Sequence, residues 1–211
     1  MSKTPNILIV DQSTGGAEAV RQELVPSGFK PVIGAVASRE EFITALSGFQ
    51  PDVVLSDHTV PGFSARAALQ ILRATRPVAP LILVTSTYDE DNATASLREG
   101  AVDIVLKQNL RRLPAAITRA LAVRQPLRKL TPRQIEIFRF VAEGQRTKHI
   151  AAMLELSVKT VESHRTEVMK RLGLANLAML VLAAVRLGLV APLSLDHPSA
   201  SRTKPPASTT S

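Results

Sequence analysis

The sequence predicts an α/β fold with a doubly wound, five-stranded parallel sheet, followed by a small all-α domain of four helices. Five short β-type runs alternate with helical patterns between residues 6 and 123. Several of these runs are almost continuously apolar, which is typical of parallel strands covered on both faces. After residue 130 the apolar residues follow helical spacing instead. The two patterns predict two domains, at residues 1–123 and 130–192.

In the first domain, each short apolar run is followed by a helical segment. We expect strands at residues 6–10, 32–36, 53–56, 81–85 and 104–106. We expect helices at about residues 14–27, 39–47, 64–75, 90–99 and 113–123. Ligands of such a sheet bind beyond the carboxyl ends of the strands, so the residues at those ends are candidates for a site.

Four polar residues end or follow different strands: Asp11, Asp57, Thr85 and Lys107. Alone, each is more often a turn residue, a helix cap or a solvated side chain than a functional group. As a set they suit one chemistry. Two carboxylates can hold Mg²⁺, and one carboxylate can attack a phosphoryl donor to form an acyl phosphate. A hydroxyl and an ammonium group can then contact the phosphate oxygens.

The motifs around these residues resemble the receiver domain of bacterial response regulators. The matching runs are ILIVD (7–11), PDVVLSDHTVPG (51–62), LILVTS (81–86) and the run ending at Lys107. By this resemblance, Asp57 accepts a phosphoryl group from a histidine kinase, and Asp11, Asp57 and the carbonyl group of Thr59 bind Mg²⁺. Thr85 is the hydroxyl switch, and Lys107 pairs with the phosphate.

Two positions depart from the receiver pattern. Gln12 stands where receivers have a second acidic residue, and Ile104 where they commonly have Tyr or Phe. An amide carries no charge, so we expect weakened Mg²⁺ binding and slower phosphorylation. The aliphatic Ile104 cannot act as an aromatic switch. The alternative is a receiver that works by protein contacts or constitutive dimerisation without phosphorylation. A phosphohydrolase is a third alternative, but the sequence lacks a second catalytic carboxylate near Asp57.

Residues 124–129, RQPLRK, are predicted to form a linker between the two domains. Pro126 is expected to break the preceding helix, and the charged neighbours to keep the segment in water. Leu130 then packs into the second domain. Thr131 is the expected N-cap, and Pro132 the first residue, of a helix that runs to about residue 142.

Two further helical patterns, at residues 147–154 and 159–172, are separated by only about three residues, so these helices must cross steeply. Ser157 is a suitable N-cap for the second of them. With Val161 and Val168 turned inward, the opposite face is polar. It carries Glu162, Ser163, Thr166 and Lys170. This layout is that of a helix-turn-helix whose second helix enters the DNA major groove.

The same region resembles the DNA-binding domain of LuxR-type regulators. The matches, in order, are LTPRQIEIF, AEG, KHIA, SVKTVESHR and KRLGL. A receiver followed by such a domain is the NarL/FixJ architecture. The first helix of the motif departs from the family, because Arg146 to His149 replace a Ser-x-x-Glu capping box. Thr147 is expected to cap that helix one residue late.

Contacts with double-stranded DNA are expected from both helices of the motif. Basic side chains and the backbone amides near Thr160 are candidates for phosphate contacts. The basic candidates are Lys148, Lys159, Arg165 and Lys170. Glu162, Ser163 and Thr166 are candidates for reading base edges. Glu162 can accept a hydrogen bond from a cytosine amino group or can pair with Arg165 or Lys159, and the sequence leaves both readings open.

The last predicted helix, over residues 177–187, begins after the N-cap Asn176 and is apolar nearly all round. One face must close the domain core, so the remainder favours either homodimerisation or packing against the receiver. Gly173 is expected to end the preceding helix. Residues 193–211 are rich in Ser, Thr and Pro and are predicted to be disordered.

Charge and composition agree with a regulator that binds DNA. Residues 1–123 carry 12 Lys/Arg and 12 Asp/Glu, whereas residues 129–191 carry 10 Lys/Arg and 5 Glu. This excess favours a polyanionic partner. The absence of cysteine excludes disulfides and thiolate chemistry. We expect a cytoplasmic protein with no membrane contact that is not an enzyme. Its expected partners are DNA, a histidine kinase, a second copy of the chain and RNA polymerase.

Overall fold

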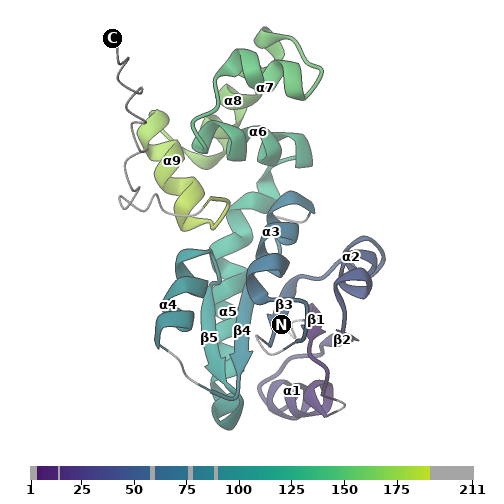
Figure 1. Cartoon of the computed structure of the whole chain (residues 1–211). Helices are drawn as coiled ribbons and strands as arrows, with labels where there is room; N and C mark the ends of the chain where they lie inside the picture. The colour runs from purple at the N-terminus through teal and green to yellow at the C-terminus, as the bar shows by residue number, and fades with distance from the viewer. Residues whose placement is uncertain (1–3, 14, 58–59, 76–77, 88–89, 191–211) are drawn as a thin grey trace, which may run out of the picture.

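The computed structural model describes residues 4–13, 15–57, 60–75, 78–87 and 90–190 of the chain. An α/β body holds the first part, and a group of helices, α6 to α9, is stacked on one end of it (Figure 1). Helix α5 (Leu113–Arg124) leads directly from the first body to the second. The predicted order of an α/β fold followed by a small helical domain is confirmed.

The sheet is parallel and has five strands in the order β2-β1-β3-β4-β5. The strands are β1 (Asn6–Val10), β2 (Val32–Val36), β3 (Val53–Ser56), β4 (Leu81–Thr85) and β5 (Asp103–Leu106). The register pairs Ile7 with Ile33 on one side and with Val53 on the other. All five strands were predicted, and only β5 differs, because it begins one residue earlier.

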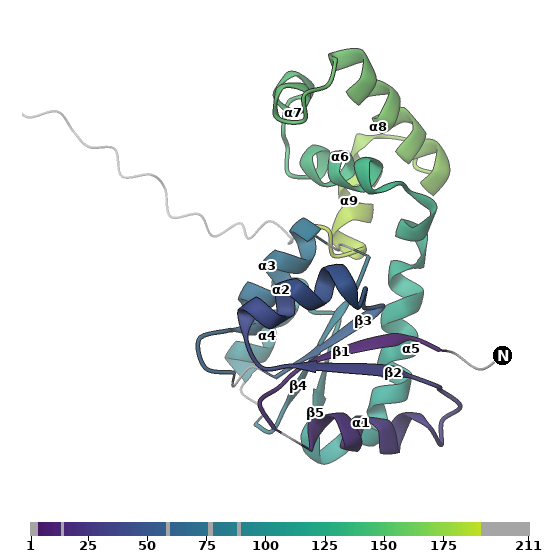
Figure 2. The ribbon, with the colours of Figure 1, turned by 90° about the vertical axis from the view of Figure 1, so that its right-hand side faces the viewer.

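Helices cover both faces of the sheet (Figure 2). On one face, α1 (Gly16–Leu24) and α5 pack against alternate strand residues such as Ile7 and Ile9. On the other face, α2 (Arg39–Gly48) and α3 (Ala65–Thr75) pack against Leu8 and Val10. Helix α4 (Glu90–Arg98) follows β4. Burial on both faces explains why these strands are apolar without alternation.

The second body consists of α6 (Pro132–Ala142), α7 (Thr147–Met153), α8 (Val158–Leu172) and α9 (Leu177–Arg186). Phe138 and Val168 lie in one of its cores, together with residues of α9. Helix α8 ends at Gly173, whose φ of 66° is the left-handed conformation that favours glycine at this position. The predicted caps Thr131, Ser157 and Asn176 all accept hydrogen bonds from backbone N–H groups of their helices.

Two expectations about local structure are wrong, one of them only in part. In the linker, α5 ends before Pro126, and Arg128 and Lys129 are exposed, as expected. However, the segment forms a 3₁₀ helix, η2 (Gln125–Lys129), in which Leu127 is 0% exposed. Leu127 packs into the helical core, and Arg124 before it is also buried. Helix α7 begins at Thr147 with Arg146 as its N-cap, and no side chain caps it. Thr147 therefore lies inside the helix, where its hydroxyl does not act as the cap.

The predicted disordered tail, residues 193–211, lies outside the described residues. Within the part of the chain that the structure describes, no single helix is long and apolar enough to cross a membrane. Helices α8 and α9 meet that test only as a pair, and the chain bends by 68° between them.

Candidate functional site

The three charged residues predicted at strand ends meet at one edge of the sheet. Asp11 follows β1, Asp57 follows the adjacent strand β3, and Lys107 follows β5. The Lys107 Nζ atom lies 2.8 Å from Asp11 Oδ2 and 2.6 Å from Asp57 Oδ2. One ammonium group therefore bridges both carboxylates. The side chain of Asp57 lies deep in this site, with only 5% of it exposed.

The electrostatics of the site favour the charged forms of Asp11 and Lys107. Burial raises the pKa of Asp11, but hydrogen bonds from Lys107 and Ser13 outweigh it and leave the pKa below its ordinary value. Burial lowers the pKa of Lys107, whereas its bonds to Asp11 and Asp57 raise it and prevail. The site is thus a preformed ion triad.

Ser13 belongs to this site, although the sequence analysis did not include it. Its backbone N–H donates to Asp11 Oδ1 and its hydroxyl donates to Asp11 Oδ2, both at 2.8 Å. Gly16, in the first turn of α1, also lies against Asp11. A Cβ at this position would lie only 2.9 Å from Asp11 Oδ2. An Asp followed two residues later by Ser is a common turn pattern, and that signal could have found Ser13.

The other predicted residues of the site lie in different surroundings. Thr85 is buried, and its hydroxyl donates to the Thr87 carbonyl at 3.0 Å. Gln12, which follows Asp11 in the sequence, is exposed. Thr59 lies outside the described residues. A cavity of about 230 Å³ adjoins Asp11, Asp57 and Lys107 and is otherwise lined mainly by apolar side chains.

Two carboxylates fit a Mg²⁺ site, though a sparse one. Mg²⁺ is commonly held by one or two protein carboxylates and several waters, and Asp11 with Asp57 supplies that number. Among the described residues, no group of three acidic, His or Cys side chains gathers as a metal site. Any cation would also meet Lys107, which already neutralises part of the charge of the pair.

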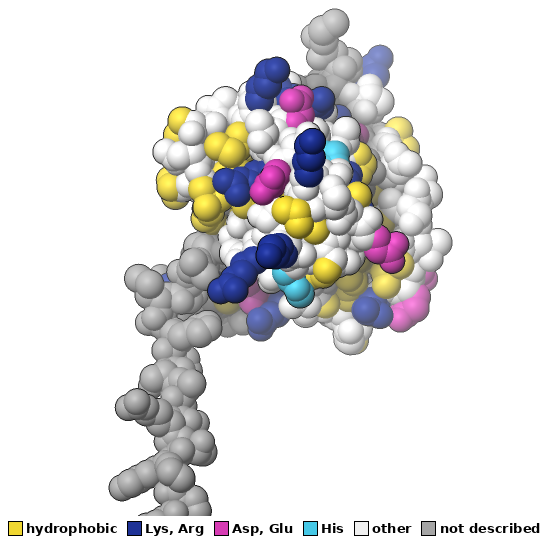
Figure 3. Space-filling model, turned by 90° about the horizontal axis from the view of Figure 1, so that it is seen from above, with side chains coloured by type: hydrophobic (Ala, Val, Ile, Leu, Met, Phe, Trp, Pro, Cys, Tyr) yellow, Lys and Arg dark blue, Asp and Glu magenta, His cyan; other side chains and the backbone are white. Residues whose placement is uncertain are grey.

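The polar face of α8 is open to solvent. Val161 and Val168 are fully buried against the other helices, as predicted. Most of the predicted DNA-contacting side chains are exposed: Lys148, Lys159, Glu162, Ser163, Thr166 and Lys170. Thr160 and Arg165 are half-buried, and the Thr160 hydroxyl lies 2.7 Å from Ser157 Oγ. Figure 3 looks down on this end of the molecule and shows Lys and Arg side chains spread over it.

The outer face of α9 is also uncovered. Leu177, Met179 and Leu182 are exposed, whereas Leu180 and Ala184 are buried in the core. Hydrophobic side chains gather on the α9 side of Figure 3. The receiver instead contacts the chain just beyond α9, where Leu189 shares a core with Val78. The outer face of α9 therefore does not pack against the receiver, which was one of the two alternatives that the sequence left open.

The two bodies match two known families. The receiver domain of response regulators matches residues 7–118, and the luxR family of bacterial regulatory proteins matches residues 128–184. The chain belongs to the response regulator family and joins a receiver to a LuxR-type DNA-binding domain. Members with this architecture are transcription regulators of the NarL/FixJ type, and a phosphorylation switch is typical of them.

Particular relatives agree with this assignment. The chain is 30% identical to the tetrathionate response regulatory protein TtrR of Salmonella typhimurium over 152 residues, which cover 67% of this chain and 74% of TtrR. It is 26% identical to the transcriptional regulatory protein FixJ of Bradyrhizobium diazoefficiens over 205 residues, which cover 90% and 99% of the two chains.

Solved structures give the same result for the whole chain. Full-length FixJ from B. japonicum superposes with a TM-score of 0.52 at 25% identity, covering 88% of this chain and 98% of FixJ. A structure of two RcsB dimers bound to two parallel DNAs superposes with a TM-score of 0.51 at 26% identity, covering 86% and 98%.

Proposed function

We propose that this protein controls transcription by binding DNA, and that its receiver accepts a phosphoryl group on Asp57 from a histidine kinase. The observation that carries the proposal is the convergence of Asp11, Asp57 and Lys107, with both carboxylates within 2.8 Å of Lys107 Nζ. A carboxylate this buried, beside a fixed ammonium group, is suited to receive a phosphoryl group whose oxygens need a cation.

In the transfer, an Asp57 oxygen attacks phosphorus, and the bond from phosphorus to the histidine nitrogen of the kinase breaks. The acyl phosphate remains on Asp57. Lys107 then pairs with a phosphate oxygen, and the Thr85 hydroxyl leaves the Thr87 carbonyl to donate to another. Mg²⁺, held by Asp11, Asp57 and the Thr59 carbonyl, would supply charge neutralisation for this step. Gln12 weakens its binding. The domain is a stoichiometric switch and not an enzyme.

On the DNA side, we propose that the basic residues Lys148, Lys159, Arg165 and Lys170, with the amide of Thr160, contact phosphates. Glu162, Ser163 and Thr166 read bases. Among the described residues, no ion pair joins Glu162 to Arg165 or Lys159, which favours the cytosine reading over an internal pair. RcsB, as two dimers on two DNAs, is a precedent for the partners proposed here.

This arrangement supports control by dimerisation better than control by release of the DNA-binding face from the receiver. The face of α8 that carries Glu162 and Thr166 is exposed while the two domains are docked, so DNA can reach it without domain release. The outer face of α9, with Leu177 and Leu182, is apolar and exposed. We propose that two copies pair through α9 in the cytoplasm, with a contribution from the receivers, and that RNA polymerase is a further partner of the DNA-bound dimer.

A second candidate is a receiver that works without phosphate. One observation favours it: Gln12 stands where receivers have a second acidic residue, and Lys107 pairs with both remaining carboxylates, Asp11 and Asp57. In that version, protein contacts or constitutive dimerisation set the activity.

The intact mass and the DNA affinity of the full chain, with and without Mg²⁺ and a small phosphodonor, distinguish the two candidates. Phosphorylation predicts a phosphoryl-sized mass gain and tighter DNA binding, both lost in Asp57→Asn. No mass gain, with equal DNA binding by both proteins, would leave the second candidate.

A further inference from the structure

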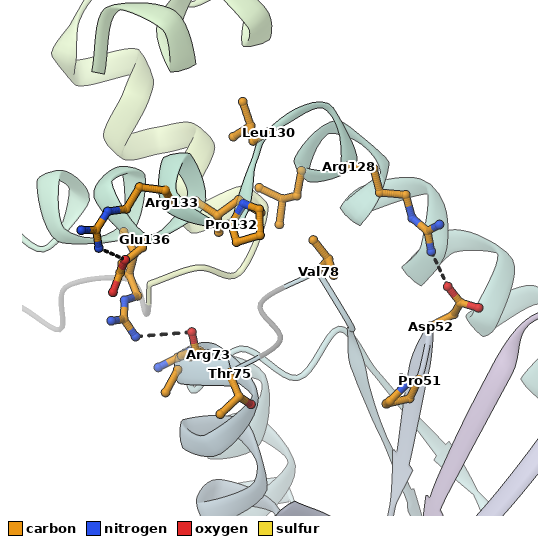
Figure 4. Close-up of a pocket in the computed structure, with 14 residues that line it drawn as sticks. Pro51, Asp52, Arg73, Thr75, Val78, Arg128, Leu130, Pro132, Arg133 and Glu136 are labelled. Carbon is orange, nitrogen blue, oxygen red and sulfur yellow. Dashed lines mark hydrogen bonds and ion pairs between the residues drawn. The ribbon is translucent and has the colours of Figure 1, made fainter. Parts of the chain in front are cut away.

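A cleft of about 660 Å³ lies where the receiver meets the helical domain (Figure 4). Its walls come from the end of α3 and the residues just before β3 on one side, and from η2 and α6 on the other. Cavities of roughly 300–1,000 Å³ at domain interfaces are common sites for small molecules. The cleft is remote from Asp57 and from the polar face of α8, so neither proposed activity uses it.

The lining of the cleft is cationic. Four arginines and two carboxylates line it, and each carboxylate already has a partner. Asp52 Oδ1 lies 2.5 Å from Arg128 Nη2, across the domain boundary, and Glu136 Oε2 lies 2.7 Å from Arg133 Nη1. Both pairs are drawn in Figure 4. Arg73 and Arg139 have no carboxylate partner within the lining, and the ion pair of Arg139 with Glu143, at 3.8 Å, lies outside it.

Arg73 and Arg139 approach each other across the two domains. Arg139 Nη1 donates to the backbone carbonyl of Arg73 at 3.3 Å, and Arg73 Nη2 donates to the carbonyl of Glu99. The Nε–H groups of both arginines are buried and meet no hydrogen-bond acceptor among the described residues. The nearest carboxylate to Arg139 Nε belongs to Glu143, at 3.8 Å, which is beyond hydrogen-bond distance.

The pKa of Arg73 is lowered from its ordinary value. Burial lowers it, the carboxylates of Glu99 and Glu143 partly restore it, and the charge of Arg139 lowers it further. Two like charges that lie close together in a partly buried position gain from a bound anion.

The remainder of the lining is apolar. It includes Val78, Leu127, Leu130, Pro132 and Ile135. A ligand that fits must therefore place an anionic group near the arginines and an apolar body against these side chains.

We propose that the cleft between the receiver and the helical domain binds a small organic anion, through a carboxylate, phosphate or sulfonate group near Arg73 and Arg139. Because its walls belong to both domains, a bound ligand stabilises their docked arrangement by mass action. The receiver would thus answer to a dissolved metabolite-sized anion in addition to any signal at Asp57.

The test is isothermal titration calorimetry on the full chain with three probes: 1-naphthalenesulfonate, inorganic sulfate, and the neutral 1-naphthalenemethanol. We expect saturable one-to-one binding of the sulfonate and much weaker binding of the other two, since each lacks half of the recognised chemistry. Arg139→Gln should weaken sulfonate binding by about 10-fold or more, as loss of a charge-assisted hydrogen bond predicts.

Ala74 offers a matched pair of variants that leave the arginines intact. It is exposed and lines the cleft, so Ala74→Trp fills the space with little risk to the fold, whereas Ala122→Trp places the same side chain at an exposed position on α5 away from the cleft. Loss of sulfonate binding in Ala74→Trp, with retention in Ala122→Trp, supports the proposal. No sulfonate binding by the wild type, or binding that neither Arg139→Gln nor Ala74→Trp alters, overturns it. Asp57→Asn should leave every result unchanged, which separates this site from the phosphorylation proposal.

Discussion

Asp11 accepts hydrogen bonds from the backbone and hydroxyl of Ser13 and from Lys107, while only 11% of its side chain is exposed. These donors lower its pKa, so the folded protein favours the ionised form of Asp11 more than the unfolded chain does. A group with a lowered folded pKa contributes stability above its unfolded pKa and loses that contribution as the pH falls through the folded value. The contribution of the hydrogen bond from Ser13 to the stability of the fold should therefore depend on pH.

Replacing Ser13 by Ala should lower the free energy of unfolding by about 1 kcal/mol at pH 7, because a hydrogen bond to a charged but partly solvated group is lost. The difference from the wild type should shrink as the pH falls below the ordinary carboxyl value of 3.8, where Asp11 becomes protonated. Urea unfolding at several pH values measures this. Ser27→Ala is the control, because the Ser27 hydroxyl donates to a neutral carbonyl, that of Glu23, and its effect should not vary with pH. A pH-independent loss in Ser13→Ala would contradict the assignment.

The exposed Gln12 gives a second prediction at this scale. Gln12→Asp adds a carboxylate beside Asp11, so the dissociation constant for Mg²⁺ should fall by about 10-fold or more. Calorimetric titration of Mg²⁺ measures the change, with Gln12→Asn as the neutral control. Equal affinity in all three proteins would mean that Gln12 does not limit metal binding.

Among the elements, α6 and α7 differ in how they begin. Helix α6 has a complete capping box, in which Thr131 Oγ1 accepts from the Gln134 N–H and the Gln134 side chain accepts from the Thr131 N–H. Helix α7 has Arg146 in the N-cap position, with extended backbone angles that suit a capping residue and no side-chain hydrogen bond. A serine at position 146 could satisfy an orphan amide of this short helix.

Arg146→Ser should therefore raise the free energy of unfolding by about 1 kcal/mol, whereas Thr131→Ala should lower it by about the same amount. Urea unfolding monitored by circular dichroism measures both. The paired variants test one mechanism in opposite directions. A loss of stability in Arg146→Ser would instead assign a structural contact to the arginine.

The sequence predicted most element boundaries because local chemistry sets them. Fully buried strands such as Val53–Ser56 are apolar without interruption, and Ser157 and Asn176 cap helices through residues only three positions away. The errors arose where distant residues decide the structure. Leu127 is buried because Leu130 and the receiver residue Val78 share a core with it, and no local pattern reveals that contact.

The candidate sites also include residues that could be predicted from the sequence and residues that could not. Asp11, Asp57 and Lys107 could be predicted, because parallel strands place their carboxyl ends at one edge of the sheet. The cleft between the domains could not be predicted. Its arginines, such as Arg73 and Arg139, lie far apart in the chain and meet only when the domains dock.

For the whole molecule, the uncovered face of α9 is the feature that bears on assembly. Leu182 is 65% exposed, while Leu180 on the opposite face is 0% exposed and packs in the core. A monomer gains nothing from an exposed leucine, whereas a partner helix would bury it.

Leu182→Glu should leave the unfolding free energy of the monomer within about 0.5 kcal/mol of the wild type, because the side chain is already in water. It should abolish cooperative binding to paired DNA half-sites and leave binding to a single half-site unchanged. Gel-shift titrations on both kinds of DNA make this measurement. Leu180→Ala is the contrasting variant, since it should cost about 2–5 kcal/mol of stability through a core cavity. Unaltered cooperativity in Leu182→Glu would place the dimer contact elsewhere.

The burial of Leu127 also decides where such a regulator can be cut and rejoined. A hybrid that exchanges receivers at residue 129 would place the other receiver's residue at position 127, and if that residue were Ala, the lost contacts in the helical core would cost about 2–5 kcal/mol. A junction just before Gln125 keeps η2 with the helices that it supports. Sensory halves should therefore be exchanged with the last short turn before α6 kept on the DNA-binding half.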